Sequence, residues 1–159
     1  MIEKLKKLQS IAQNIGYNVE LHTKNKEITQ DFLQISFQDN DKNIQSASLM
    51  FSPLSQEFEN NDIITFYYHL PFANTNISNE LLSFVFYVNG RLPIGHINIQ
   101  NDKIQLRYNY MTSKENSVVE KSFKEILVVF IGEILTQMQI ISDFVQKKIT
   151  LQESFKRIG

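Results

Sequence analysis

The sequence predicts an α+β fold in which a single antiparallel sheet of about five or six strands carries helices mainly on one face. Residues 76–144 read as a helix, a glycine turn, a two-stranded hairpin and a long helix. Two strands joined by a tight turn between two helices cannot form a parallel βαβ unit, so they belong to an antiparallel sheet. Residues 17–70 contain short runs in which apolar and polar residues alternate, which is typical of half-buried strands. The expected order is helix, four strands, helix, two strands and long helix.

Residues 1–16 predict an amphipathic helix with a charged outer face, because apolar residues recur every three or four positions. Gly16 stands where a left-handed residue would end this helix. Residues 17–22 then alternate and predict a short strand. Residues 23–30 are polar and show no period, so the chain from Tyr17 to Gln30 fits either one strand or a strand followed by a loop. The apolar positions of the helix are Ile2, Leu5, Leu8, Ile11, Ala12 and Ile15.

Residues 31–70 predict three further strands. Residues 39–43 are rich in Asp and Asn, which favours a turn between the first two of them. The second strand is expected to end before Pro53, residues 54–62 to form a polar loop, and the third strand to end at Pro71. Apolar residues on one face of these strands are Leu33, Ile35, Phe37, Ala47, Leu49, Phe51, Ile64, Phe66, Tyr68 and Leu70.

Residues 78–159 predict three helices around a hairpin. Ser78 is a suitable N-cap for a helix that ends at Gly90. Residues 101–102 turn the hairpin, and the Ser117/Glu120 and Thr150/Glu153 pairs have the spacing of capping boxes that open a long helix and a short terminal one. The expected buried residues of the first helix are Leu81, Leu82, Val85, Phe86 and Val88. Those of the long helix are Phe123, Leu127, Phe130, Ile131, Ile134, Met138, Ile141 and Val145.

Length and composition indicate one soluble domain covering residues 1–159. The net charge of −1 and sequence pI of about 6.3 argue against a nucleic-acid partner, which would favour a clustered basic surface. The absence of cysteine excludes disulfides and thiolate metal sites. The N-terminus has no apolar h-region, and the longest apolar run, residues 126–131, is far shorter than a membrane span. We therefore expect a cytoplasmic protein.

The sequence contains no recognisable catalytic, cofactor or metal motif. His22, His69 and His96 are not spaced for a helical metal site, although His69 and His96 could meet across strands if they shared a sheet face. Asp39 and Asp41 fall in a turn, where Asp is favoured by local backbone hydrogen bonds. The acidic pair Glu57 and Glu59 falls in the expected polar loop, and the two glycines at positions 90 and 95 precede a strand, unlike a phosphate-binding loop. We therefore predict a non-enzymatic protein without cofactor or metal.

The second face of the predicted sheet carries the candidate site. Alternation places Tyr, His, Asn and Arg side chains there, and Tyr and Arg are favoured anchors of protein interfaces. Three interpretations are open: a solvated sheet face, a surface for a protein partner or a second subunit, and the site of a small-ligand sensor or enzyme. The candidate partner-binding residues are Tyr67, His69, His96, Asn98, Arg107 and Asn109. The sensor or enzyme alternative would use Tyr67, His69, His96 and Arg107.

The long helix raises a related question. Residues 126–131 are apolar on every side of the helix, so they need more cover than one sheet face provides. Either the first helix packs over them or a partner does, and the second alternative makes a homodimer possible.

One stretch also resembles a known family. A helix ends in Asn89-Gly90-Arg91-Leu92-Pro93, Gly95-His96-Ile97-Asn98-Ile99 begins a strand, and Ile104-Gln105-Leu106-Arg107-Tyr108 follows ahead of a long helix. This pattern resembles the YbjN-like family, which shares its fold with chaperones of bacterial type III secretion. The resemblance covers the second half of the chain in its motifs and the first half in element order. It implies a chaperone-like fold and a regulatory or protein-binding role, and it supplies no catalytic residues.

Overall fold

The computed structural model describes residues 1–70, 77–100, 103–114 and 120–158. It confirms an α+β fold built on one open antiparallel sheet, and the sheet has six strands. The helices and strands are α1 (Ile2–Asn14), β1 (Asn18–His22), β2 (Phe32–Gln38), β3 (Ile44–Phe51), a 3-10 turn (Pro53–Gln56), β4 (Asn61–His69), α2 (Asn79–Asn89), β5 (His96–Gln100), β6 (Lys103–Ser113), α3 (Glu120–Glu133), a π-helical turn (Ile134–Met138), α4 (Gln139–Val145) and α5 (Leu151–Ile158).

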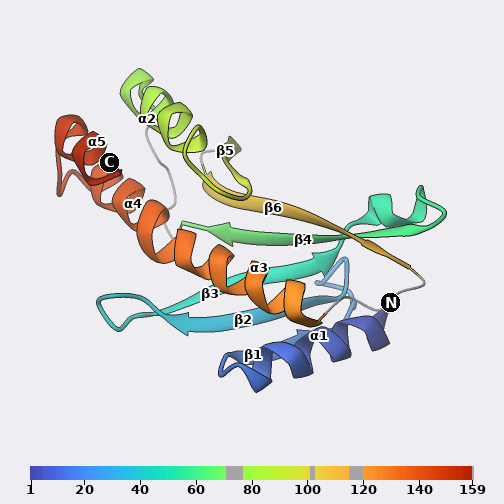
Figure 1. The fold of residues 1–159 in the computed structure, drawn as a ribbon. Helices are drawn as coiled ribbons and strands as arrows, with labels where there is room; N and C mark the ends of the chain where they lie inside the picture. Colours follow the sequence, from blue (N-terminus) through green and yellow to red (C-terminus); the bar gives the residue numbers. More distant parts are fainter. Residues whose placement is uncertain (71–76, 101–102, 115–119, 159) are drawn as a thin grey trace.

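The strands lie in the order β1-β2-β3-β4-β6-β5, and each neighbouring pair is antiparallel. The central pair β4–β6 is the longest, with nine residues of β4 in register with β6. Figure 1 shows α1 and the continuous α3–α4 helix lying across the same side of the sheet. We refer to the opposite side, which these helices leave uncovered, as the open face.

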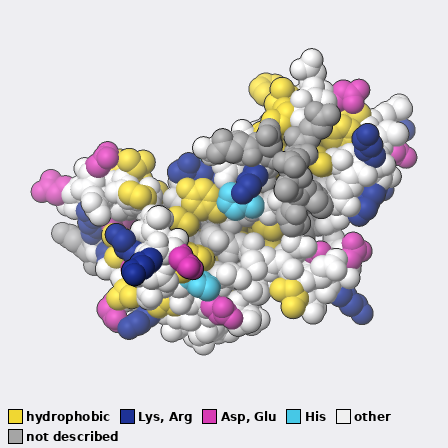
Figure 2. All heavy atoms as spheres, turned by 180° about the vertical axis from the view of Figure 1, so that it is seen from behind, with side chains coloured by type: hydrophobic (Ala, Val, Ile, Leu, Met, Phe, Trp, Pro, Cys, Tyr) yellow, Lys and Arg dark blue, Asp and Glu magenta, His cyan; other side chains and the backbone are white. Residues whose placement is uncertain are grey.

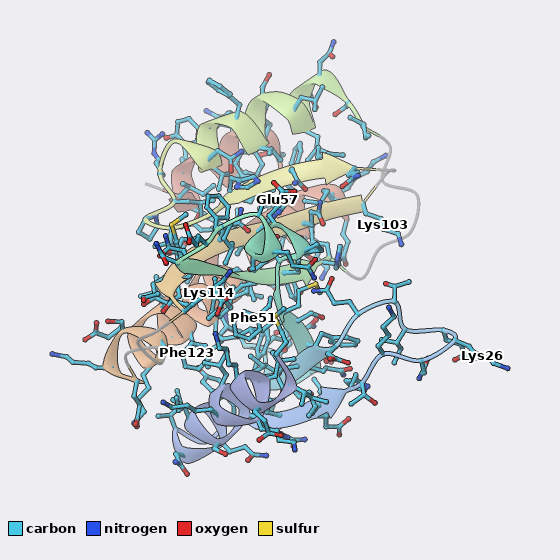
Figure 3. All side chains as sticks on the ribbon, turned by 90° about the vertical axis from the view of Figure 1, so that its right-hand side faces the viewer. Lys26, Phe51, Glu57, Lys103, Lys114 and Phe123 are labelled. Atoms are coloured by element: carbon cyan, nitrogen blue, oxygen red, sulfur yellow. The ribbon has the colours of Figure 1, made fainter. Side chains whose placement is uncertain are left out.

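The first half of the chain follows the prediction closely. Gly16 has φ +97 directly after α1, so it ends the helix in the left-handed conformation. The question left open for residues 17–30 is settled, because β1 ends at His22 and a connection leads to β2 at Phe32. Lys26 lies at the tip of this connection, which projects from the body of the molecule (Figure 3).

The expected polar loop over residues 54–62 is wrong at both ends. Ser52 caps a 3-10 turn by accepting a hydrogen bond from the Leu54 N–H, and β4 already begins at Asn61. The buried Ser55 hydroxyl bonds both backbone groups of Ile63, at 2.8 Å from the N–H and 3.3 Å from the carbonyl. These bonds hold the turn against β4, so the chain here is structured where its polar composition predicted a loop.

Helix α2 begins as predicted, with the Ser78 hydroxyl accepting a hydrogen bond from the Leu81 N–H at 3.1 Å. The predicted buried face is partly wrong, because Leu82 and Phe86 are 47% and 83% exposed. Phe84 is buried instead, at ring-centroid distances of 5.4 Å and 5.5 Å from Phe144 and Phe155. Packing against α4 and α5 thus selects the buried side of α2, and neither contact can be read from the period of α2 alone.

The long helix runs without a break over Glu120–Val145. Its predicted stripe is buried, with the last position, Val145, half-buried. It includes a π-helical turn at Ile134–Met138, and there the Leu135 carbonyl accepts a hydrogen bond from Nδ2 of Asn40 at 3.2 Å. The turn between β2 and β3 is thereby attached to the middle of the helix.

The capping boxes have different outcomes. The Thr150/Glu153 box is confirmed: the Thr150 N–H donates to the Glu153 carboxylate at 2.7 Å, and the Glu153 N–H donates to the Thr150 hydroxyl at 3.2 Å. Ser117 of the other box and the expected turn at residues 101–102 lie outside the described residues.

The core lies between the helices and the apolar face of the sheet. Phe66 is at its centre, with ring-centroid distances of 5.3 Å to Phe130, 6.1 Å to Phe123 and 6.0 Å to Tyr108. Figure 3 shows Phe123 on the helical side of the sheet and Lys103 on the opposite side. The inner face is therefore apolar as the alternation predicted, and the open face is mostly polar. Apolar side chains on the open face include Phe32, Met50, Ile63 and Met111.

By length and composition the helix Glu120–Val145 could also cross a membrane, which the short apolar run in the sequence had argued against. Here its stripe packs on the sheet, and α1 contacts α3. Val128 and Val129 on its outer side stay 54% and 38% exposed. The first helix therefore covers the long helix in part and leaves a small apolar area at the surface.

Candidate binding face

One row of side chains crosses the whole open face, with one residue from each strand. The register joins each of them to its neighbour, from β1 at one edge to β5 at the other. Directly opposed residues of antiparallel strands point to the same side of a sheet, so these side chains share the open face. In spatial order they are Glu20, Gln34, Ser48, Tyr67, Arg107 and His96.

All six residues that alternation selected lie on the open face, seen from behind in Figure 2. Three belong to the row just described, and the other three lie in the rows on either side of it. The first three are Tyr67, Arg107 and His96, and the others are His69, Asn98 and Asn109. The structure therefore brings the predicted residues together on strands β4, β6 and β5.

Arg107 is held in place by its neighbours. Its guanidinium carbon lies 5.3 Å from the centre of the Tyr67 ring, and its Nε donates to Oδ1 of Asn109 at 3.4 Å. The Thr65 hydroxyl donates to the same oxygen at 2.9 Å. The Tyr67 and His69 rings are nearly parallel, with centroids 6.4 Å apart. This packing orients a cation on the open face before any partner is present, which lowers the entropic cost of binding.

Asn98 carries an unsatisfied acceptor at this site. Its Oδ1 is buried and has no hydrogen-bond partner among the described residues. The neighbouring Gln105, which faces Asn98 across the strand pair, donates to Gln100 at 3.3 Å. A buried acceptor without a partner costs free energy, so this position is a local cost to stability.

His69 and His96 do not meet. They lie on β4 and β5, with β6 between them, and in adjacent rows. Strand spacing and rise place their backbones about 12 Å apart. No group of three His, Asp or Glu side chains that could hold a metal occurs in the described part of the chain. Partial burial and the nearby Lys103 lower the pKa of His69, so its neutral form is favoured.

Edge strand β5 is capped by a side chain from α2. The Asn89 amide nitrogen donates to the Ile97 carbonyl at 2.8 Å, and the Ile97 N–H donates to Oδ1 of Asn89 at 2.6 Å. These are the two hydrogen bonds that an added strand would form at this position. Gly95 (φ +77) lets β5 approach closely, because a Cβ there would lie 2.7 Å from the Arg107 carbonyl oxygen.

The other edge strand is also occupied. The Val19 carbonyl of β1 accepts hydrogen bonds from the amide nitrogens of Gln9 at 3.0 Å and Gln13 at 3.3 Å, both on α1. Carboxamides from neighbouring helices thus occupy backbone groups at both edges of the sheet. Sequence reasoning missed Gln9, Gln13 and Asn89. The sequence shows only that each is an amide residue on a helix next to an edge strand, and the contact itself is formed in the tertiary structure.

Four of the cavities lined by described residues lie away from this site. The largest, about 780 Å³, lies between the start of α2 and the α4–α5 connection, and one of about 680 Å³ lies beside Tyr17 and Ile44. Two of about 240 Å³ lie next to Gln30 and next to Asp39. None of the four is lined by any of the six predicted residues.

Asp39 has the turn role that the sequence predicted. Its carboxylate accepts hydrogen bonds from the Asp41 and Asn43 N–H groups at 3.0 Å and 2.8 Å, and from Nε2 of Gln45 at 2.9 Å. The Gln45 bond and the two backbone bonds hold its pKa below the usual value. The acid therefore stabilises the turn, and its lone pairs are occupied by the chain itself.

Comparison of the chain with models of protein families and with curated proteins gave no match. The function is therefore inferred from the geometry of the molecule.

Proposed function

We propose that this chain is a non-enzymatic, cytoplasmic protein-binding module that receives a partner polypeptide on its open sheet face. The observation that carries this proposal is the row of six side chains across an uncovered sheet, with Arg107 held over Tyr67. Tyr and Arg are frequent anchors of interfaces, and an orientated Arg is ready for a bidentate partner. The resemblance to YbjN-like proteins and secretion chaperones supports the same role.

The face is a better candidate than the edges. A peptide that adds to a sheet edge needs free backbone donors and acceptors along the edge strand. Asn89 occupies both such groups of Ile97, while Gln9 and Gln13 occupy the carbonyl of Val19. Natural proteins protect sheet edges in this way against unwanted pairing. We therefore place the partner over the side chains of the open face.

A small-ligand sensor or enzyme is less well supported. Small-molecule sites are concave, with a few convergent polar groups. Tyr67, His69, His96 and Arg107 line none of the four cavities, and the two histidines are separated by a strand. A broad, polar and orientated surface suits a polypeptide.

Self-association is a second candidate role, through a different surface. Phe86 and Leu82 lie one helical turn apart on the outer side of α2, and both are exposed. An exposed aromatic residue beside an exposed leucine favours a protein contact. The partner there would be a second copy of the chain. Light scattering over a range of concentrations measures the solution mass and therefore this self-association. A Phe86→Ser variant should shift any dimer toward monomer.

The test of the proposed face uses a matched pair of substitutions. Ser48→Arg places a large side chain in the middle of the row, and Ser10→Arg makes the same change on the exposed side of α1. Tagged chains are isolated from the native host, and co-purifying proteins are quantified by mass spectrometry. We expect a discrete partner that Ser10→Arg retains and Ser48→Arg loses. An unchanged set of proteins in both variants would show that the open face is not the binding surface.

A further inference from the structure

One half of the open face carries charge of a single sign. On β4, β6 and β5, the described residues that point to this face include the cations Lys103 and Arg107 and the histidines His69 and His96, and none is acidic. The chain as a whole has 17 acidic and 16 basic residues and a net charge of −1. Because acids are slightly in excess overall, their absence among the described residues of this half-face is a local feature.

The remaining half of the face adds one acid and one histidine. Glu20 and His22 lie on β1, with the His22 Nε2 3.8 Å from a Glu20 carboxylate oxygen and the His22 ring stacked on Phe32 at 4.7 Å. All three histidines of the chain therefore lie on the open face. Two of them are on the half that carries the cations.

We propose that the half-face formed by β4, β6 and β5 binds an acidic, extended segment of a partner polypeptide, and binds it more tightly below neutral pH. This rests on the proposed function, because it names the partner of the same surface. Lys103 and Arg107 are four residues apart on β6, or about 13 Å at the rise of a strand. Carboxylates at every second position of an extended segment can match that spacing, since they point to one side.

The geometry favours a polypeptide over other anions. Nucleic acids bind through many phosphate contacts, and this half-face offers two permanent cations. If a second copy of the chain bound face to face, Arg107 and Lys103 would lie opposite the same cationic half-face and would be repelled by it.

Protonation of the histidines sets the sign of the pH dependence. Histidines gain a positive charge between about pH 8 and pH 5. His69 lies on this half-face near Lys103 and Tyr67, so its protonation makes a cationic half-face more positive. Lys103 and partial burial lower the pKa of His69, so it is charged at a lower pH than usual. Below about pH 4 the partner's carboxylates are protonated, and binding should be lost.

The test measures fluorescence anisotropy of a labelled peptide of alternating glutamate and serine, with alternating glutamine and serine as the uncharged control. We expect saturable binding of the glutamate peptide alone, tightened about three- to tenfold between pH 8 and pH 5. Arg107→Gln should weaken it about tenfold, while Lys121→Gln, the same change of charge on the outer side of α3, should leave it unchanged. His69→Gln should keep the binding and reduce its pH dependence. Circular dichroism confirms that each variant is folded.

Three results would overturn the inference: no saturable binding of the glutamate peptide, equal losses in Arg107→Gln and Lys121→Gln, or tighter binding of oligothymidylate or phosphatidylserine vesicles than of the peptide. The Ser48→Arg experiment separates this from the proposed function. If it identifies a partner on the open face and the peptide still does not bind, the acidic chemistry is wrong and the protein-binding role stands. If both fail, the protein-binding role fails as well.

Discussion

The side-chain amide of Asn89, the last residue of α2, forms both hydrogen bonds that a neighbouring strand would form with Ile97 of β5. The helix that precedes the hairpin thus caps the sheet edge at Ile97. At the opposite edge, Gln9 and Gln13 bond the Val19 carbonyl. Backbone groups are therefore occupied at one position of each edge, while the open face presents its side chains.

Removing the cap should expose the edge of β5. We expect Asn89→Ala to destabilise the fold by about 1–3 kcal/mol, because it leaves two backbone groups of Ile97 without partners. It should also promote concentration-dependent self-association through the edge. Urea unfolding and light scattering measure the two effects. Asn79→Ala, at the exposed first turn of the same helix, is the control and should change neither.

Two phenylalanines of α2 should respond in opposite ways. Phe84→Ala should cost about 3–5 kcal/mol of unfolding free energy, because Phe84 is fully buried between Phe144 and Phe155. Phe86→Ala should change it by less than about 0.5 kcal/mol, since Phe86 is 83% exposed. Urea unfolding of both variants checks this. A similar loss in both would mean that α2 packs through a different side.

This pair also shows where sequence reasoning stops. Residues 84–87 are aromatic or apolar at four consecutive positions, so the helical period does not decide which of them face inward. The choice depends on Phe155 of α5, which lies far along the chain and contacts both Phe84 and Tyr87. The strands were easier to predict, because their alternation leaves two choices of face and the stripe of the long helix selects one.

The same reasoning explains the outcome for the site. Alternation alone placed Tyr67, His69, His96, Asn98, Arg107 and Asn109 on the open face. It could not show the edge caps, because each joins a helix to a strand by a single side chain. Nor could it show the π-helical turn, where the Leu135 carbonyl accepts a hydrogen bond from Asn40 of the β2–β3 turn. Both features depend on contacts between elements that the local sequence does not encode.

Two glycines should respond differently to an added methyl group. Gly95→Ala should destabilise the fold by about 1–3 kcal/mol, because φ is +77 and the Cβ would lie 2.7 Å from the Arg107 carbonyl. Gly132→Ala should stabilise it by up to about 1 kcal/mol, since Gly132 is helical and its Cβ would meet no atom within 4 Å. Thermal unfolding compares the two. A neutral effect of Gly95→Ala would contradict the close approach of β5 to β6.

Tyr68 predicts a loss of stability at alkaline pH. Burial, together with the negative charge of Asp39, raises the pKa of Tyr68 to about 12. Its stabilisation is therefore complete below the unfolded value of about 10 and is lost as pH rises from about 10 to 12, for a total of about 2–3 kcal/mol. Urea unfolding between pH 8.5 and 11.5 measures this loss. In the Tyr68→Phe variant, the loss of unfolding free energy between these pH values should be smaller by about 2–3 kcal/mol. If the variant and the parent chain showed the same pH dependence, Tyr68 would be accessible to solvent.

The central claim, that the open face receives a partner polypeptide, is tested most directly by photo-crosslinking in the native host. A photoreactive phenylalanine replaces Gln34 in the row on the open face or, as a control, Lys121 on the outer side of α3. The account predicts that position 34 yields one discrete cross-linked polypeptide and position 121 does not. A partner captured at position 121 and not at position 34 would contradict it, because the binding surface would then be helical.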